Sequence, residues 1–252
     1  MRRTLAAVLT AVAVAALSLV LPVPAGAAES SIAGRIIVID PGHQLGNSNP
    51  RFARQISATR FNGSIIKGCN TTGTATNAGL PEATFTWRVA KRLRTLLEEQ
   101  GATVVLTRSS NSRDAWGPCT WDRARIGTEA GADVMVSIHA DGASPRGRGF
   151  HVIAPSSIAG WTTDMAKPSR RLARAMISGM TRAGAEQATY LSSPLSVRAD
   201  QTTLNFSDVP TVIVETGNMR NGSDAARMSS ARGQQQYAEW LAAGITAYFS
   251  SA

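Results

Sequence analysis

Residues 35–43 read RIIVIDPGH, and this stretch decides the fold. Four β-branched residues follow Arg35, and a short apolar run of this kind is typical of a buried strand. Polar and turn-forming residues follow at once, from Asp40 to His43. The stretch therefore predicts a buried strand whose carboxyl end carries chemically active side chains.

Further short apolar runs along the chain predict more strands of the same kind. They lie at residues 102–107, 133–138, 149–154 and 210–214. Each is bounded by polar, glycine or proline residues. Continuous apolar strands of this type are buried on both faces, as in a parallel sheet.

Amphipathic segments separate these strands and predict helices. The clearest opens at Pro81, places Phe85, Val89 and Leu93 on one stripe, and stops at Gly101. The other expected helices span residues 121–130, 169–183 and 234–249. Alternating strands and helices indicate an α/β fold. We expect one domain with a mainly parallel, twisted sheet of about six strands flanked by helices.

The composition is that of a globular protein. The 252 residues are 43% hydrophobic and 17% charged, which excludes a disordered tail, a coiled coil and a collagen-like fibre. Lys and Arg number 26 against 17 Asp and Glu, so the formal net charge is +9. The chain has only two cysteines and three histidines. Each of these can be weighed individually as a functional residue.

The N-terminal segment predicts export. Arg2 and Arg3 precede an uncharged apolar run at residues 5–21, and Ala25-Gly26-Ala27 forms a small-residue cleavage site. A membrane anchor is the alternative, but the apolar run is shorter than the ~20 residues of a typical span. We expect a signal peptide at residues 1–27 and no transmembrane segment after its removal. The remaining chain, residues 28–252 with charge +7, would reach the periplasm, the cell wall or the medium.

Export makes a disulfide between Cys69 and Cys119 the expected state of the two cysteines, since only one pairing exists. Closing a loop of this length stabilises by roughly 3–4 kcal/mol in the chain-entropy model. A zinc-thiolate site would need more soft ligands than two distant cysteines. Residues 44–79 form a polar stretch of 36 residues, too long for an ordinary connection. We expect a long loop there, pinned by the disulfide.

Three candidate catalytic side chains follow predicted strands. His43, His139 and Glu215 come after the strands at 35–39, 133–138 and 210–214. The carboxyl ends of parallel strands form the ligand crevice of an open α/β sheet, so these residues converge on one edge. Glu82 adds a fourth, because it lies on the apolar stripe of its helix, where an unpaired carboxylate is costly.

Two imidazoles and one carboxylate are a known ligand set for catalytic zinc. Zinc would supply the positive partner that Glu82 lacks. The spacing alone leaves two simpler interpretations open. A histidine at a strand end is commonly a hydrogen-bonded structural residue, and a glutamate at a helix start is commonly a partner of the helix dipole.

Several motifs in one order carry a family resemblance. Asp40-Pro41-Gly42-His43, Glu82, Ser137-Ile138-His139-Ala140-Asp141 and Val214-Glu215-Thr216-Gly217-Asn218 resemble those of zinc-dependent N-acetylmuramoyl-L-alanine amidases, the amidase 3 family. The resemblance spans roughly residues 35–249. Stand-alone actinobacterial members also carry the Gly-Pro-Cys at 117–119 and the Gly-Arg-Gly-Phe-His-Val at 147–152.

The resemblance implies one zinc ion per chain, bound by His43, Glu82 and His139 at the carboxyl edge of the sheet. It implies that Glu215 is the catalytic acid and base. The substrate would be peptidoglycan or muropeptides, cut between N-acetylmuramic acid and L-alanine. Zinc lowers the pKa of a bound water towards ~7 and polarises a carbonyl, which suits this hydrolysis.

Other polar residues near these motifs have weaker assignments. Arg198 resembles a position near the family's active site, so it either contacts substrate or forms a surface salt bridge. Asn218 replaces an apolar or aromatic residue and is a second candidate substrate contact. His151 is expected to be structural, since the family uses no ligand there. Asp40 and Asp141 either orient the ligands or form turns.

Two other classes of function compete with the enzyme. A non-catalytic wall-binding protein on the same fold would have lost a ligand or Glu215, and this chain keeps all four. A secreted nucleic-acid binder is suggested by the positive charge, but its arginines are scattered rather than arranged along a recognition element. We therefore expect an exported monomeric amidase that has no nucleic-acid partner.

Overall fold

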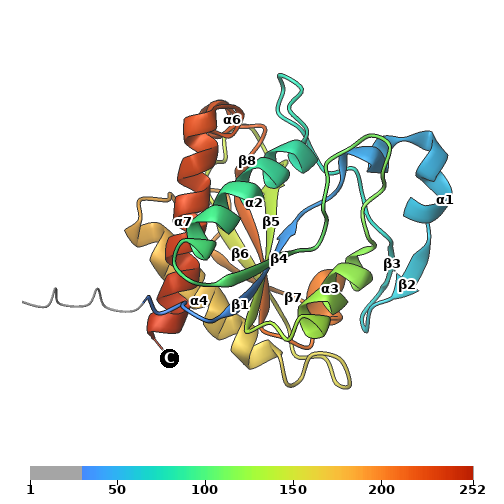
Figure 1. Ribbon diagram of the computed structural model, residues 1–252. Coiled ribbons are helices and arrows are strands. Elements are labelled where there is room, and N and C mark those ends of the chain that lie inside the picture. Colours follow the sequence, from blue (N-terminus) through green and yellow to red (C-terminus); the bar gives the residue numbers. More distant parts are fainter. Residues whose placement is uncertain (1–29, 252) are drawn as a thin grey trace, which may run out of the picture.

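The computed structural model describes residues 30–251 (Figure 1). The predicted signal peptide at 1–27 lies outside these residues. The main sheet has six strands in the order β4-β1-β5-β8-β6-β7. In chain order the six strands are β1 (Ile36–Pro41), β4 (Thr103–Leu106), β5 (Val134–Asp141), β6 (His151–Pro155), β7 (Leu195–Arg198) and β8 (Thr211–Asn218).

All neighbouring strands in this sheet are parallel except β6 and β8, which pair antiparallel. The predicted α/β fold with a mainly parallel sheet is confirmed. Strand β7 was not predicted, because it is four residues long and only partly buried. A short edge strand of this kind leaves little pattern in a sequence.

Three long helices pack together against one face of the sheet, and Figure 1 shows them on the same side of the strands. They bury the continuous apolar core, which includes Leu93, Val136, Leu172 and Leu241. These helices are α2 (Glu82–Glu98), α4 (Ala166–Arg182) and α7 (Ala231–Ser250), with α6 (Gly222–Ser229) packed on α7.

The opposite face of the sheet carries shorter elements. Helix α3 (Thr120–Glu129) contacts β1 and the short helix α5 (Thr202–Asn205). The stretch predicted as a loop at 44–79 holds several elements of three or four residues. These are two 3-10 turns (Leu45–Ser48 and Pro50–Phe52), α1 (Ala53–Ile56), and a hairpin of β2 (Thr59–Phe61) and β3 (Ile66–Gly68). Elements this short contain too few residues for hydrophobic periodicity to predict them from the sequence.

Two strands run further than their apolar residues predicted. The predicted ends at Ile138 and Val214 are wrong, because β5 continues to Asp141 and β8 to Asn218. Backbone pairing between the two strands carries on through polar residues, with a register shift after His139. His139 and Glu215 therefore lie inside paired strands rather than on loops, which fixes their backbones.

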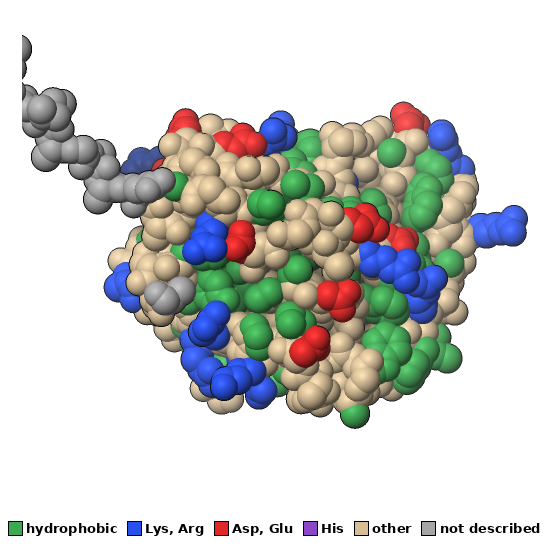
Figure 2. Space-filling view, turned by 60° about the horizontal axis from the view of Figure 1, so that its bottom comes forward, with side chains coloured by type: hydrophobic (Ala, Val, Ile, Leu, Met, Phe, Trp, Pro, Cys, Tyr) green, Lys and Arg blue, Asp and Glu red, His purple; other side chains and the backbone are tan. Residues whose placement is uncertain are grey.

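Among residues 30–251, no helix is both long and apolar enough to cross a membrane. Figure 2 shows one face of the molecule, where Lys and Arg side chains lie in separate groups with acidic side chains nearby.

Candidate active site and metal centre

The three predicted metal ligands meet at the carboxyl edge of the sheet. His43 follows β1, Glu82 begins α2 and His139 lies in β5. Each offers one ligand atom, and these atoms all lie within 4.8 Å of one another. Glu82 Oε1 is 3.2 Å from His43 Nε2 and 2.9 Å from His139 Nδ1. Two imidazole nitrogens and a carboxylate oxygen arranged in this way fit a zinc ion.

His43 is held in place by the backbone around it. Its φ of 60° lies in the left-handed region, which is uncommon for a residue with a side chain. Its Nδ1 hydrogen-bonds the Thr71 carbonyl oxygen at 3.0 Å. That bond leaves Nε2 facing Glu82. A fixed outer nitrogen sets the tautomer and the orientation of a ligating imidazole.

Glu82 is a buried carboxylate with a complete set of partners. Oε2 accepts a hydrogen bond from the Thr74 backbone N–H at 2.9 Å, and Oε1 accepts one from that of Ala140 at 3.1 Å. Burial alone would raise the pKa of Glu82. His43 and His139 outweigh it and hold this pKa well below its usual range. The carboxylate is therefore charged, as a metal ligand must be.

Two glycines leave the space that this cluster needs. A Cβ on Gly42 would lie within 2.7 Å of three ring atoms of His139. A Cβ on Gly73, whose φ is +75°, would lie 2.7 Å from Glu82 Oε2 and from His43 Cδ2. Side chains at these positions would displace the ligands, so the close packing around them depends on glycine.

Asp40 supports the cluster through a buried ion pair, which the sequence did not predict. Arg123 Nη1 donates to Asp40 Oδ1 at 2.7 Å, and its Nη2 donates to the His43 carbonyl oxygen at 2.7 Å. Burial alone would raise the pKa of Asp40, but Arg123, with hydrogen bonds from Ser137 and Thr107, lowers it to about 2. Asp40 lies in β1 rather than in a turn, and Arg123 links its carboxylate to the His43 backbone.

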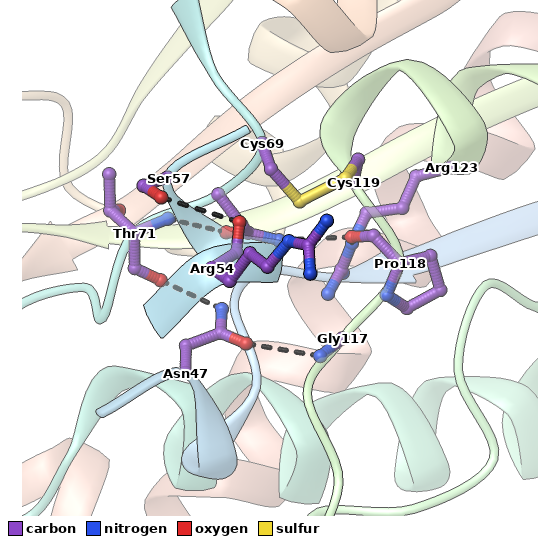
Figure 3. Close-up of a disulfide and its surroundings, with 10 residues drawn as sticks. Asn47, Arg54, Ser57, Cys69, Thr71, Gly117, Pro118, Cys119 and Arg123 are labelled. Atoms are coloured by element: carbon purple, nitrogen blue, oxygen red, sulfur yellow. Dashed lines mark hydrogen bonds between the residues drawn. A yellow bond between two sulfur atoms is a disulfide. The ribbon is translucent and has the colours of Figure 1, made fainter. Parts of the chain in front are cut away.

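The disulfide between Cys69 and Cys119 is present, as predicted (Figure 3). It joins the segment after β3 to the residue before α3, one helical turn ahead of Arg123. Asn47 adds a second link, because its side chain donates to the Thr71 carbonyl and accepts from the Gly117 N–H. The bridge therefore ties the segment that carries Thr71 to the helix that carries Arg123.

Glu215 lies beside the cluster, opposite His139 in the parallel pairing of β5 and β8. Its Oε2 is buried and has no hydrogen-bond partner among the described residues. Burial raises the pKa of Glu215 well above its usual range. Glu82 and Asp141 raise it further, and Arg198 opposes them. A raised pKa makes a carboxyl group better suited to hold and return a proton than an ordinary exposed carboxylate.

Asp141 and Arg198 are two further candidate residues near the metal ligands. Asp141 accepts a hydrogen bond from the Tyr190 hydroxyl at 3.1 Å and borders the cavity. Arg198 forms a two-pronged salt bridge with Asp200, at 2.8 and 2.7 Å. One of its two predicted roles, the salt bridge, is therefore present. Contact with a substrate stays a prediction.

Asn218 is fully buried, and its side chain holds a loop. Its amide donates to the carbonyls of Ser144 and Gly147, and its oxygen accepts from the Arg220 N–H. In this structure the side chain thus offers no free polar atom to a substrate. The loop that it holds precedes β6.

A cavity of about 350 Å³ opens over the cluster. His43, Glu82, His139 and Glu215 all line it. From there it extends to Lys67 on the hairpin and to Asp200. The Lys67 Nζ and Asp200 Oδ2 atoms lie 3.6 Å apart. The cavity therefore joins the metal ligands and Glu215 to a charged outer end.

Comparison with known proteins gives consistent matches. A family model described as N-acetylmuramoyl-L-alanine amidase matches residues 37–247. The chain is 37% identical to an N-acetylmuramoyl-L-alanine amidase of Mycobacterium tuberculosis, over 90% of this chain and 91% of that protein.

Two crystal structures of the amidase Ami1 are similar to the chain. The Mycobacterium smegmatis protein has a TM-score of 0.80 at 36% identity, covering 88% of this chain and 99% of that one. The Mycobacterium abscessus protein has a TM-score of 0.79 at 38% identity, covering 86% and 99%.

Proposed function

The chain belongs to the N-acetylmuramoyl-L-alanine amidase family, amidase 3, and from this premise we propose how its site works. The enzyme is a peptidoglycan amidase. We propose that it depends on zinc held by His43, Glu82 and His139, and that Glu215 is its general acid and base. The observation that supports this most is the convergence of three ligand atoms within 4.8 Å, with Glu215 directly across the strand pair from His139.

The chain's own contacts suit these three residues to metal binding. The Thr71 carbonyl fixes the ring of His43, and two backbone N–H groups fix the carboxylate of Glu82. Bound zinc would supply a water of lowered pKa and would polarise the scissile carbonyl.

Glu215 would move the proton. Its carboxylate takes a proton from the attacking water, and the new C–O bond forms at the lactyl carbonyl carbon. The same carboxyl then gives the proton to the nitrogen of L-alanine as the C–N bond breaks. An unprotonated amine is a very poor leaving group, so delivery of this proton is required for cleavage.

We further propose that the enzyme acts outside the cytoplasm as a monomer. The basic, apolar and small-residue segments of residues 1–27 support export, and a disulfide suits an oxidising compartment. The positive charge that remains after cleavage would aid encounter with anionic wall polymers.

Metal content separates the two proposed roles. His139→Ala should bind less than one zinc per chain and lose activity on muropeptides. Glu215→Ala should keep one zinc per chain and also lose activity. Zinc analysis of both purified variants, beside wild type, makes this comparison. Loss of zinc from Glu215→Ala, or activity retained by it, would contradict the proposal.

A further inference from the structure

A row of functional side chains crosses the sheet at one level. In the pairing of β5 with β8, His139 lies opposite Glu215. In the antiparallel pairing of β8 with β6, Glu215 lies opposite His151. Directly opposed residues of neighbouring strands project from the same face. Glu215 is therefore flanked by a metal ligand on one side and by His151 on the other.

His151 and Glu215 each have a buried polar atom without a partner. Within residues 30–251, His151 Nδ1 and Glu215 Oε2 are buried and accept or donate no hydrogen bond. Nearly all buried polar atoms are paired, and an unpaired one costs about 1–3 kcal/mol. The two atoms do not hydrogen-bond each other in the structure, but they belong to residues that are paired across β6 and β8.

The ring of His151 packs against Tyr190 and lies near Asp141. The two rings meet edge-on, with their centroids 6.1 Å apart. Tyr190 in turn donates to Asp141, whose Oδ2 lies 3.9 Å from His151 Nδ1. Burial lowers the pKa of His151, and so does Arg198, against the opposing effect of Asp141. The imidazole is therefore neutral at pH 7 and carries one donor and one acceptor.

The strand pairing makes His151 and Glu215 direct neighbours. Cβ atoms of directly opposed residues are about 4.5–5.5 Å apart. The hydrogen bond that we infer requires the Glu215 side chain to turn towards β6. An apolar residue at position 151 would fill the space without providing this contact. The next opposed pair on the same face is apolar and consists of Ile153 and Ile213.

We propose that His151 is a positioning residue, which hydrogen-bonds the Glu215 carboxyl and holds it in the orientation that passes a proton from the attacking water to the leaving amine. This inference rests on the proposed role of Glu215. It adds a residue that does not line the cavity over the metal ligands.

His151→Phe and His151→Asn test this role. The phenylalanine keeps a ring against Tyr190 and removes both nitrogens, whereas the asparagine restores a polar donor. We expect His151→Phe to lower kcat on a soluble muropeptide about 10- to 100-fold, which is part of the ~10²–10⁴-fold that a positioned general acid and base contributes. KM and zinc content should stay at the wild-type values. His151→Asn should recover a substantial part of the loss in kcat.

Ile153→Ala is the matched control, because Ile153 is buried on the same strand and face. It should lower the thermal midpoint and leave kcat of the folded protein unchanged. If the phenylalanine prevents folding, His151→Leu repeats the test with a smaller apolar side chain. Wild-type kcat in a folded apolar variant, or an equal loss of kcat in Ile153→Ala, would overturn the inference.

The two proposals fail in different ways. If wild type releases no product, or if Glu215→Ala stays active, the proposed function fails. If wild type is active, needs Glu215 and binds zinc, but His151→Phe has an unchanged kcat, only the role of His151 fails.

Discussion

The two faces of the central sheet are built from the same strands and differ in almost every other respect. On β5, Val134, Val136 and Ile138 face the core of α2, α4 and α7. Ser137 and His139 alternate with them and face the ion pair and the metal cluster. Side chains alternate along a strand, so one segment can serve both faces. Along β5, one set of alternate residues therefore builds the apolar core, and the other set builds the site.

The forces on the two faces also differ. Each fully buried aliphatic side chain on the helical face stabilises the fold by about 1.5–3 kcal/mol. The site face instead buries the Asp40–Arg123 pair, and a buried ion pair adds little net stability over an apolar pair. The ion pair instead positions a metal ligand, because Arg123 also donates a hydrogen bond to the His43 carbonyl oxygen. Substitutions on the two faces should therefore have different signatures.

Arg123→Met should have the largest effect on stability. The variant leaves the Asp40 carboxylate buried without its partner, which typically costs about 3–5 kcal/mol. It also removes a donor to the His43 carbonyl, so zinc affinity should fall as well. Denaturant unfolding and zinc titration measure the two effects.

The control for Arg123→Met is Arg125→Met, because Arg125 is exposed on the same helix. It should change the free energy of unfolding by less than about 0.5 kcal/mol. Equal losses of unfolding free energy in the two variants would show that the buried ion pair does not cause the effect of Arg123→Met.

Leu93→Ala tests the helical face on the helix that also carries Glu82. Leu93 is fully buried, and truncating a buried leucine costs about 2–5 kcal/mol of unfolding free energy. We expect about 3 kcal/mol, with kcat and zinc content per folded chain unchanged. A fall in kcat at full zinc occupancy would show that the two faces are not separable.

Acid unfolding gives the smallest effect. The pKa of Asp40 falls from its ordinary 3.8 to about 2 in the folded protein. A lowered folded pKa stabilises above pH 3.8, and this stability is lost as pH falls towards 2. The difference corresponds to roughly 2 kcal/mol. Unfolding of metal-free wild type and Asp40→Asn between pH 5 and 2 should show a weaker pH dependence in the variant; identical slopes would contradict the assignment.

The sequence predicted the helical face better than the site face. Apolar runs such as Ile36–Ile39 and the stripe of Phe85, Val89 and Leu93 indicate both the element and its buried side. The convergence of His43, His139 and Glu215 also followed from sequence, because parallel strands end at one edge.

Contacts that depend on register and on distant loops could not be predicted. Nothing in the residues around Arg123 indicates that it pairs with Asp40, 83 positions away. His151 faces Glu215 only because β6 runs antiparallel to β8, and a shift of one residue would turn it to the other face. The resemblance, in which the family uses no ligand at this position, therefore predicted only a structural residue.

Mass spectrometry of the reaction products tests the central claim most directly. The protein beginning at Ala28 is incubated with peptidoglycan and with muropeptides, with and without a chelator. The account predicts release of intact stem peptides with a free L-alanine amine, blocked by the chelator and restored by zinc. No release from protein that holds one zinc per chain, or release that the chelator does not affect, would contradict it.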